Sequence, residues 1–277
     1  MSAKIFLNVY SIQNDWDSDP IACLEKMKEI GYDGLEFTLN IEETLFEKVL
    51  AKMKELELIA VSTHIEFNDF VARTDYYFDR ARKAGMKYLM IPWLEQSRIP
   101  GGENYVQTKG DIVKLAAWCA AKGFTLCYHN HDFEFKKING VCKQDILLSD
   151  IPELDTQLDV CWCVVGGQNP ADYIRRYGDR MPTLHLKDFS VEGDIYGVKL
   201  FDLLGQNDAA EAAETRNECG FKFQPVGMGH VDFPSIFEAA DEVGVKWMIV
   251  EQDTSPDRPA LEAARLSFNY ISANYKR

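Results

Sequence analysis

One local pattern recurs along the chain: an amphipathic helix ends at a glycine, and an apolar strand follows within a few residues. It occurs at Gly31, Gly85, Gly123 and Gly244, and the run Tyr88-Leu-Met-Ile shows the character of the strands. Glycine suits the position after a helix, because that residue often adopts a left-handed backbone conformation. Strands that are apolar nearly throughout are typical of parallel sheets covered on both faces. The pattern therefore predicts alternating helices and parallel strands.

The repeat occurs often enough to define the fold class. Strand-like runs lie at about 4–9, 34–37, 58–64, 87–92, 124–129, 154–159, 181–186 and 246–251. Helical stretches follow near 20–30, 42–56, 69–84, 104–122, 143–150, 170–177, 233–243 and 258–274. Eight units in 277 residues leave about 35 residues each, the size of one strand with its helix. We predict an α/β fold with a single (β/α)8 TIM barrel domain over residues 1–277. An open doubly wound sheet is the alternative, and no GxGxxG follows a strand to support dinucleotide binding.

One connection is much longer than the others. An extended loop insertion occupies about 190–230, between the strand ending near Leu186 and the helix beginning near Pro234. Residues 208–218 within it have a helical pattern. A long loop in a compact domain is commonly a lid or an interface element, and a decorative insertion is the alternative.

Composition excludes several classes of partner. The formal net charge of −14 argues against nucleic acid and against an anionic membrane surface, because both need clustered basic residues. No apolar stretch reaches the roughly 18 residues of a membrane span, and no signal-peptide pattern is seen. The seven cysteines include no CxxC pair, and we interpret them as reduced core thiols, with Cys127, Cys161 and Cys163 in strands. We expect a cytoplasmic protein whose partner is a small molecule. Whether the chain forms a homo-oligomer stays open.

Polar side chains stand at the carboxyl ends of the predicted strands, where TIM barrels place their chemistry. They are Glu36, His64, His129, His131, Asp159, His185, Lys187 and Glu251. A buried apolar strand does not end in a charged residue for packing reasons, because an unpaired buried charge is costly. We therefore expect the site at this end of the barrel.

Three of these residues predict a metal site. Asp159, His185 and Glu251 come from three adjacent strands at equivalent depth, so their side chains should converge. Oxygen and imidazole ligands suit Mn²⁺, Mg²⁺, Co²⁺ or Zn²⁺, and the sequence does not choose between them. Lys187 lies two residues beyond His185 and points the same way. It could stabilise an oxyanion, and a structural ion pair with Asp188 or Glu251 is the alternative.

Several strings at these ends carry a family resemblance. The chain resembles the sugar phosphate isomerase/epimerase family, the xylose-isomerase-like TIM barrels, from near residue 6 to the C-terminus. The matching strings are Gly31-Tyr-Asp-Gly-Leu-Glu36, Tyr128-His-Asn-His-Asp-Phe-Glu134-Phe, Leu158-Asp-Val-Cys-Trp162 followed by Gly166-Gly, His185-Leu-Lys-Asp188 and Ile249-Val-Glu-Gln-Asp253.

The resemblance implies one divalent metal ion held by carboxylates and a histidine from the last four strands. The clean matches are Asp159, His185 and Glu251. Many relatives have a glutamate at the end of strand five, where this chain has His129 or His131, so we take Glu134 as the fourth ligand. The string Val226-Gly-Met-Gly-His230 also differs from the family pattern, because similar proteins often carry an acidic residue in place of Met228. No phosphate cradle is visible, so a phosphorylated substrate has no support.

Two kinds of enzyme fit this site. The leading hypothesis is a sugar isomerase or epimerase that moves a proton next to a carbonyl of a sugar or keto-sugar, with Glu134 and Glu251 as the catalytic carboxylates. The alternative is a metal-dependent lyase or dehydratase of a keto-sugar, 3-keto-glycoside or inosose, in which His129, His131 or Lys187 protonates the leaving oxygen. One of the strand-five histidines could instead only orient a ligand.

The expected substrate contacts are Glu36, His64, His129 and Trp162. Glu36 could equally orient a neighbouring side chain. A DNA-repair endonuclease of the same superfamily is disfavoured, since that chemistry needs more histidine and aspartate ligands and a basic face. A non-catalytic sugar-binding barrel is the last alternative.

Overall fold

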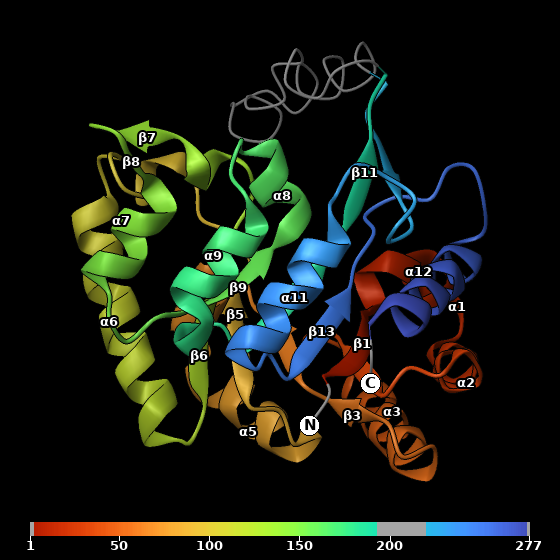
Figure 1. The fold of residues 1–277 in the computed structure, drawn as a ribbon. Coiled ribbons are helices and arrows are strands. Elements are labelled where there is room, and N and C mark those ends of the chain that lie inside the picture. The colour runs from red at the N-terminus through yellow and green to blue at the C-terminus, as the bar shows by residue number, and fades with distance from the viewer. Residues whose placement is uncertain (1–2, 193–219, 276–277) are drawn as a thin grey trace.

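The computed structural model describes residues 3–192 and 220–275, and these form a nearly closed barrel of parallel strands surrounded by helices (Figure 1). The strand order is β3-β2-β1-β13-β10-β9-β6-β5-β4. The strands are β1 (Lys4–Asn8), β2 (Gly34–Glu36), β3 (Ile59–Ala60), β4 (Ser62–His64), β5 (Tyr88–Ile91), β6 (Thr125–His129), β9 (Asp155–Asp159), β10 (Thr183–Leu186) and β13 (Trp247–Val250). The predicted TIM barrel is confirmed.

The barrel closes within a single predicted strand. The expected run 58–64 is divided into β3, which pairs with β2, and β4, which pairs with β5. Val61 lies between them, and its amide donates to the Leu35 carbonyl while its carbonyl accepts from the Lys87 amide. The chain therefore changes partners at Val61 without leaving the barrel wall, which gives nine strands at eight positions.

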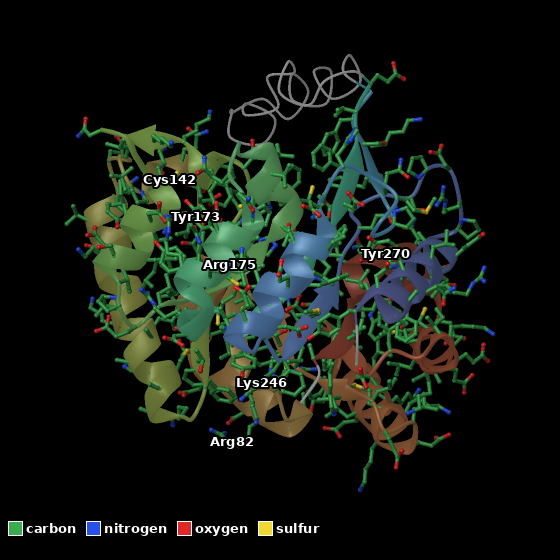
Figure 2. The ribbon with its side chains drawn as sticks, viewed as in Figure 1. Arg82, Cys142, Tyr173, Arg175, Lys246 and Tyr270 are labelled. Carbon is green, nitrogen blue, oxygen red and sulfur yellow. The ribbon has the colours of Figure 1, made fainter. Side chains whose placement is uncertain are left out.

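The helices follow the strands as the periodicity predicts. They are α2 (Pro20–Ile30), α3 (Glu43–Glu55), α4 (Phe67–Ala72), α5 (Thr74–Ala84), α6 (Tyr105–Ala121), α7 (Lys143–Asp150), α9 (Pro170–Tyr177), α11 (Phe233–Val243) and α12 (Ala260–Asn274). The expected helix 69–84 is broken at Arg73 into α4 and α5. Surface pairs join neighbouring helices: Arg175 on α9, which is labelled in Figure 2, lies 2.6 Å from Glu242 on α11. Among the described residues, no helix is long and apolar enough to cross a membrane.

Two short helices were not predicted, namely α1 (Gln13–Ser18) and α8 (Val160–Val165). The second corrects the assignment of Cys161 and Cys163 to a strand, because α8 begins directly after β9. The Asp159 carboxylate accepts from the Trp162 amide at 2.9 Å and caps this helix. An apolar run buried on every side has no periodicity, which concealed the helix. The six described cysteines are buried and unbridged, and Cys219 lies outside the described residues.

The described ends of the insertion form a two-stranded antiparallel ribbon, β11 (Asp188–Ser190) with β12 (Lys222–Gln224). The expected helix 208–218 lies outside the described residues. Asp188 holds the glycine string that follows, accepting from the amides of Gly227 at 3.0 Å and Gly229 at 2.8 Å. Gly227 has φ +85° and packs on Tyr270 of α12 (Figure 2), where a Cβ would lie 2.3 Å from the ring. Only glycine fits this position.

The barrel interior has an apolar floor and a polar mouth. Phe6, Val61 and Ile249 form a small buried cluster separate from the main core. Because side chains alternate across a strand, residues two positions further along β1 and β13 share this inward side. Those residues are Asn8 and Glu251, so the site stands directly above an apolar floor.

Candidate metal centre and active site

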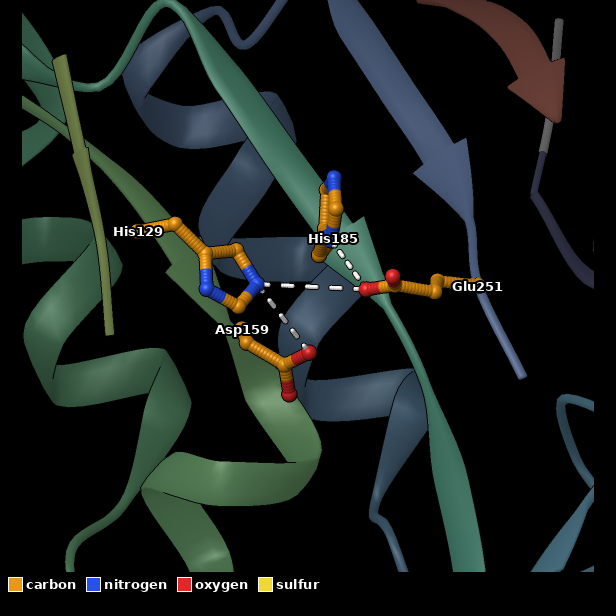
Figure 3. A group of neighbouring side chains, drawn as sticks. All are labelled: His129, Asp159, His185 and Glu251. Atoms are coloured by element: carbon orange, nitrogen blue, oxygen red, sulfur yellow. Dashed lines mark hydrogen bonds and ion pairs between the residues drawn. The ribbon is translucent and has the colours of Figure 1, made fainter. Parts of the chain in front are cut away.

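Four buried side chains converge at the carboxyl ends of β6, β9, β10 and β13 (Figure 3): His129, Asp159, His185 and Glu251. His129 Nε2 lies 3.6 Å from Asp159 Oδ2 and 3.8 Å from Glu251 Oε2. His185 Nδ1 lies 2.7 Å from Glu251 Oε2. One ligand atom from each side chain falls within 4.8 Å of the others. The structure thus brings together Asp159, His185 and Glu251 as expected, and adds His129.

The structure does not bring Glu134, the expected fourth ligand, to this cluster. After β6 the chain enters a 3-10 turn, Phe133–Phe135, and Glu134 is used inside it. One carboxylate oxygen accepts from the Tyr128 hydroxyl, and the other accepts from the His131 amide at 2.9 Å. Burial raises the pKa of Glu134 to about 8. The strand-five position in the cluster belongs to His129.

The donor atoms of the cluster fit a divalent cation. Both ring nitrogens of His129 and Oδ2 of Asp159 are buried without a hydrogen-bond partner among the described residues. Orphaned buried polar atoms are costly, and a bound cation would remove that cost. Two imidazoles and two carboxylates form a donor set used for Zn²⁺, Mn²⁺ and similar ions.

The charges of the cluster are balanced by close partners. Burial opposes protonation of His185, but Glu251 and Glu36 outweigh it and raise its pKa to about 10. A cation bound through Nδ1 would therefore have to displace the proton that this nitrogen shares with Glu251. Burial also opposes ionisation of Glu251, yet Lys187 and His185 hold its pKa well below the usual range. For His129, burial and the neighbouring His185 lower the pKa. His129 is therefore a neutral imidazole, the form that binds metals.

Glu36 lies on the far side of His185 and makes four hydrogen bonds. One oxygen accepts from Asn8 Nδ2 at 2.9 Å and lies 2.8 Å from His185 Nε2. The other accepts from the Ser62 hydroxyl and from Gln157 Nε2 at 3.0 Å. With four hydrogen bonds made to the chain, Glu36 is placed to orient His185, and its contact with substrate stays a prediction. Its Oε1 also lies 3.4 Å from His64 Nε2, and Glu36, His64 and His185 form a second group whose donor atoms lie close enough together to hold a cation.

His64 lies at the edge of the cluster. Its ring stacks on that of His185 with centroids 5.4 Å apart, and its Nε2 lies 2.8 Å from the Gln157 side-chain oxygen. The side chain is 23% exposed, whereas those of Glu36 and His185 are fully buried. Its contact with substrate stays a prediction.

Lys187 is buried beside the cluster. Its Nζ lies 2.6 Å from Asp253 Oδ1, 3.5 Å from Glu251 Oε2 and 3.6 Å from Asp159 Oδ2. It also faces the rings of Trp162 and Phe223, 5.3 and 5.2 Å from their centroids. Asp188 is occupied by the glycine string, so the ion pairs of Lys187 are with the carboxylates of the cluster and with Asp253.

His131 points into the same mouth. Its ring lies 5.1 Å from that of His129 and 5.9 Å from that of Trp162, and it stacks on Phe133. Its buried Nδ1 has no hydrogen-bond partner among the described residues. Trp162 itself is only 1% exposed.

Sequence reasoning missed four residues of this site: Asn8, Gln157, Asp253 and Phe223. Gln157 had a usable signal, since it lies two positions before Asp159 and must share its side of the strand. Asn8 likewise ends a strand with a polar residue. Phe223 had no such signal, because it lies after the long insertion and is brought to the site only by the pairing of β12 with β11.

The chain belongs to the xylose isomerase-like TIM barrel family, whose model matches residues 24–272. It is 27% identical over 267 residues to an inosose dehydratase of Clostridium botulinum, covering 84% of this chain and 82% of that protein. A sugar phosphate isomerase/epimerase from Parabacteroides distasonis superposes with a TM-score of 0.73 at 20% identity, covering 99% and 95% of the two chains. A 3-keto-D-glucoside 4-epimerase from Escherichia coli superposes with a TM-score of 0.70 at 15% identity, covering 98% and 99%.

These similar proteins are named as enzymes of two kinds, epimerases and dehydratases. At such low identities the superpositions show only that the fold is shared. The reaction must be inferred from the residues of the site.

Proposed function

We propose that this chain is a metal-dependent carbon–oxygen lyase that acts on a keto-sugar, a keto-glycoside or an inosose. One observation favours a lyase over an isomerase or epimerase. Glu134 lies outside the cluster, and the imidazole of His129 occupies the position expected for it. A proton exchange between two faces of one carbon is best served by carboxylates on opposite sides of the metal. The expected pair of Glu134 with Glu251 is not formed here, because Glu134 is bound to Tyr128 and the His131 amide. By contrast, two groups suited to an elimination, His131 and Lys187, lie beside the cluster.

The proposed ligands of one divalent ion are His129, Asp159, His185 and Glu251. When bound, such an ion polarises a carbonyl and stabilises negative charge on its oxygen. Glu36 holds His185 in place through Nε2, which leaves Nδ1 directed at the cluster. Carboxylate–histidine pairs of this kind fix the ring and raise its basicity as a ligand.

The elimination needs a base and a proton donor from the chain. The base removes the proton from the carbon next to the carbonyl, the carbon–oxygen bond beyond it breaks, and the electron pair leaves with the oxygen, which takes a proton. His131 is the proposed base and proton carrier: its buried Nδ1, which has no hydrogen-bond partner among the described residues, takes the proton from carbon and passes it to the leaving oxygen. Burial and the neighbouring His129 hold the pKa of His131 well below its usual value, so the ring is neutral before it takes this proton. Lys187, held 3.5 Å from Glu251, supplies fixed positive charge near the developing oxyanion.

An isomerase or epimerase is the second candidate. Lys187 lies within 3.6 Å of Asp159 and 3.5 Å of Glu251, so it could return a proton that a carboxylate has removed. The similarity to an inosose dehydratase and the withdrawn position of Glu134 both favour the lyase.

The test is turnover in deuterated water with added Mn²⁺ or Co²⁺ and a panel of 3-keto-glycosides and inososes. Release of an alcohol or water, lost in His131→Ala and kept in His230→Ala, is expected. His230 is a suitable control, because it contacts the Val191 carbonyl, away from the cluster. Deuterium entering an intact sugar with no group released would replace the lyase with the isomerase.

A further inference from the structure

A cavity lies next to the proposed centre. It is an open cavity with a volume of about 550 Å³, lined by two segments, residues 10–15 and residues 253–256 with 258–260. These follow β1 and β13, which are neighbouring parallel strands (Figure 1). The Gln252 amide donates to Ser11 Oγ at 3.0 Å and ties the two segments together. The cavity therefore lies at the carboxyl ends of the strands, the same end of the barrel as the buried cluster.

One residue, Asp253, joins the cavity to the cluster. It lines the cavity and bonds Lys187 at 2.6 Å, and Lys187 in turn lies 3.5 Å from Glu251. None of the four proposed metal ligands lines the cavity. A molecule whose carbonyl is held at the cluster can fill the cavity only with a second part that extends past Asp253.

The lining suits a hydroxylated ring. Gln13, Asn14 and Ser255 offer both donors and acceptors, and Tyr10 presents an aromatic ring that is 52% exposed. Arg258 makes no ion pair within residues 3–192 and 220–275, and its side chain reaches only the Met228 sulfur at 3.5 Å. Its remaining N–H groups can donate to ligand oxygens. Polar groups of both kinds around one flat ring bind the edges and the face of a sugar.

We propose that this cavity binds the leaving-group half of a two-part substrate, a second hydroxylated ring joined by a glycosidic bond to the keto-sugar at the cluster. The inference rests on the proposed lyase activity and narrows its substrate class. The carbon–hydrogen bond next to the carbonyl breaks, a carbon–carbon double bond forms, and the glycosidic oxygen leaves with its electron pair and takes a proton. The products are an unsaturated keto-sugar and a free sugar, with no redox partner required. An inosose, which loses only water, would leave the cavity unused.

The experiment compares a 3-keto-disaccharide with the methyl 3-keto-glycoside of the same keto ring, on the full chain loaded with Mn²⁺. Binding of the remote ring should appear as an excess in kcat/KM for the disaccharide of about tenfold or more. Tyr10→Ala and Gln13→Ala should each cut this ratio, Tyr10→Ala by about tenfold, since it removes the exposed ring. Trp118→Ala is the control, because Trp118 is similarly exposed and lines a cavity of about 560 Å³ on the outer helices.

Equal kcat/KM for the two substrates, or a ratio that Tyr10→Ala does not change, would overturn the inference while leaving the lyase activity standing. If neither substrate reacts, the lyase proposal fails, and calorimetric binding of the 3-keto-disaccharide decides on the cavity alone. Binding that is weakened in Tyr10→Ala but not in Trp118→Ala supports the subsite. Absence of binding, or equal binding by all three proteins, rejects it.

Discussion

The two ring nitrogens of His185 face regions of opposite character. On the Nε2 side, the Glu36 carboxylate is surrounded by Asn8, Ser62 and Gln157 as well as the histidine, and its acceptor positions are filled. On the Nδ1 side, the rings and carboxylates of the cluster include buried atoms with no hydrogen-bond partner among the described residues. Buried polar groups are nearly always satisfied in native proteins.

The difference separates scaffold from binding site. On the Glu36 side the carboxylate has four hydrogen bonds within the chain, which fits the proposed role of holding His185. On the cluster side, the proposed cation between His129, Asp159, His185 and Glu251 would satisfy the buried atoms that have no partner among the described residues. Each of the following variants tests one side of this division.

The largest effect should follow from removing a proposed ligand. Asp159→Asn keeps the oxygen that caps α8 but replaces Oδ2 with an amide that cannot bind a cation. We expect about one divalent ion per wild-type chain and below about 0.1 in the variant, with activity lost and the helical circular dichroism retained. His185→Ala should also lose the ion, although it leaves two buried carboxylates without their partner. His230→Ala should keep it. A metal-free preparation with full activity would contradict the proposed centre.

A smaller effect on the same metal should follow from a change on the scaffold side. Glu36→Gln keeps the shape of the side chain but removes the charge that orients His185. Outer partners of metal-binding histidines typically contribute about 10- to 100-fold in affinity, so competition with a fluorescent chelator should show a loss of that size. The matched control is Glu95→Gln, whose side chain is 62% exposed. An unchanged affinity would mean that Glu36 is dispensable to the cluster.

The barrel and three proposed ligands could be predicted because both depend on local patterns. The helix–glycine–strand repeats indicate a parallel sheet. In that sheet His185 pairs with Asp159, and Leu186 pairs with Val250, the residue before Glu251, so the three side chains meet at one end of the barrel. The division of one strand into β3 and β4 could not be predicted, because it depends on which neighbour each half meets. Neither could α8, whose burial on all sides erased its periodicity.

The fourth member of the cluster shows where sequence reasoning stopped. The family resemblance implies a glutamate near this strand end, and it points to Glu134 only if a turn carries that side chain back to the cluster. The turn instead binds the carboxylate to Tyr128 and to the His131 amide, a contact set by backbone geometry that residue type does not reveal. His129, the last residue of the strand itself, needed no such turn.

Glu134 therefore predicts an effect on stability without an effect on the metal. Its pKa is raised from 4.5 to about 8 by burial, so the folded protein holds a proton that the unfolded chain has released. The contribution of this proton to the free energy of unfolding is fully present below pH 4.5. It is lost as the pH rises from 4.5 to about 8, where the free energy of unfolding falls by about 1.4 kcal/mol per pH unit. Denaturant unfolding of Glu134→Gln should lack this slope, and elemental analysis should find its metal content unchanged. Loss of the ion in this variant would restore Glu134 as a ligand.

The smallest effect should come from Asn8, the residue that touches both sides. Its amide donates to Glu36 at 2.9 Å and to Glu251 at 3.3 Å, while its oxygen accepts from the Tyr10 amide. Asn8→Ser keeps a hydroxyl for the Tyr10 amide and removes both donations, which should cost about 1 kcal/mol of stability. Because the two sides share this one amide, Asn8→Ser and Glu36→Gln should couple by about 0.5–1 kcal/mol in a double-mutant cycle on metal affinity. Strict additivity would show that Asn8 does not carry the effect of Glu36 to the cluster.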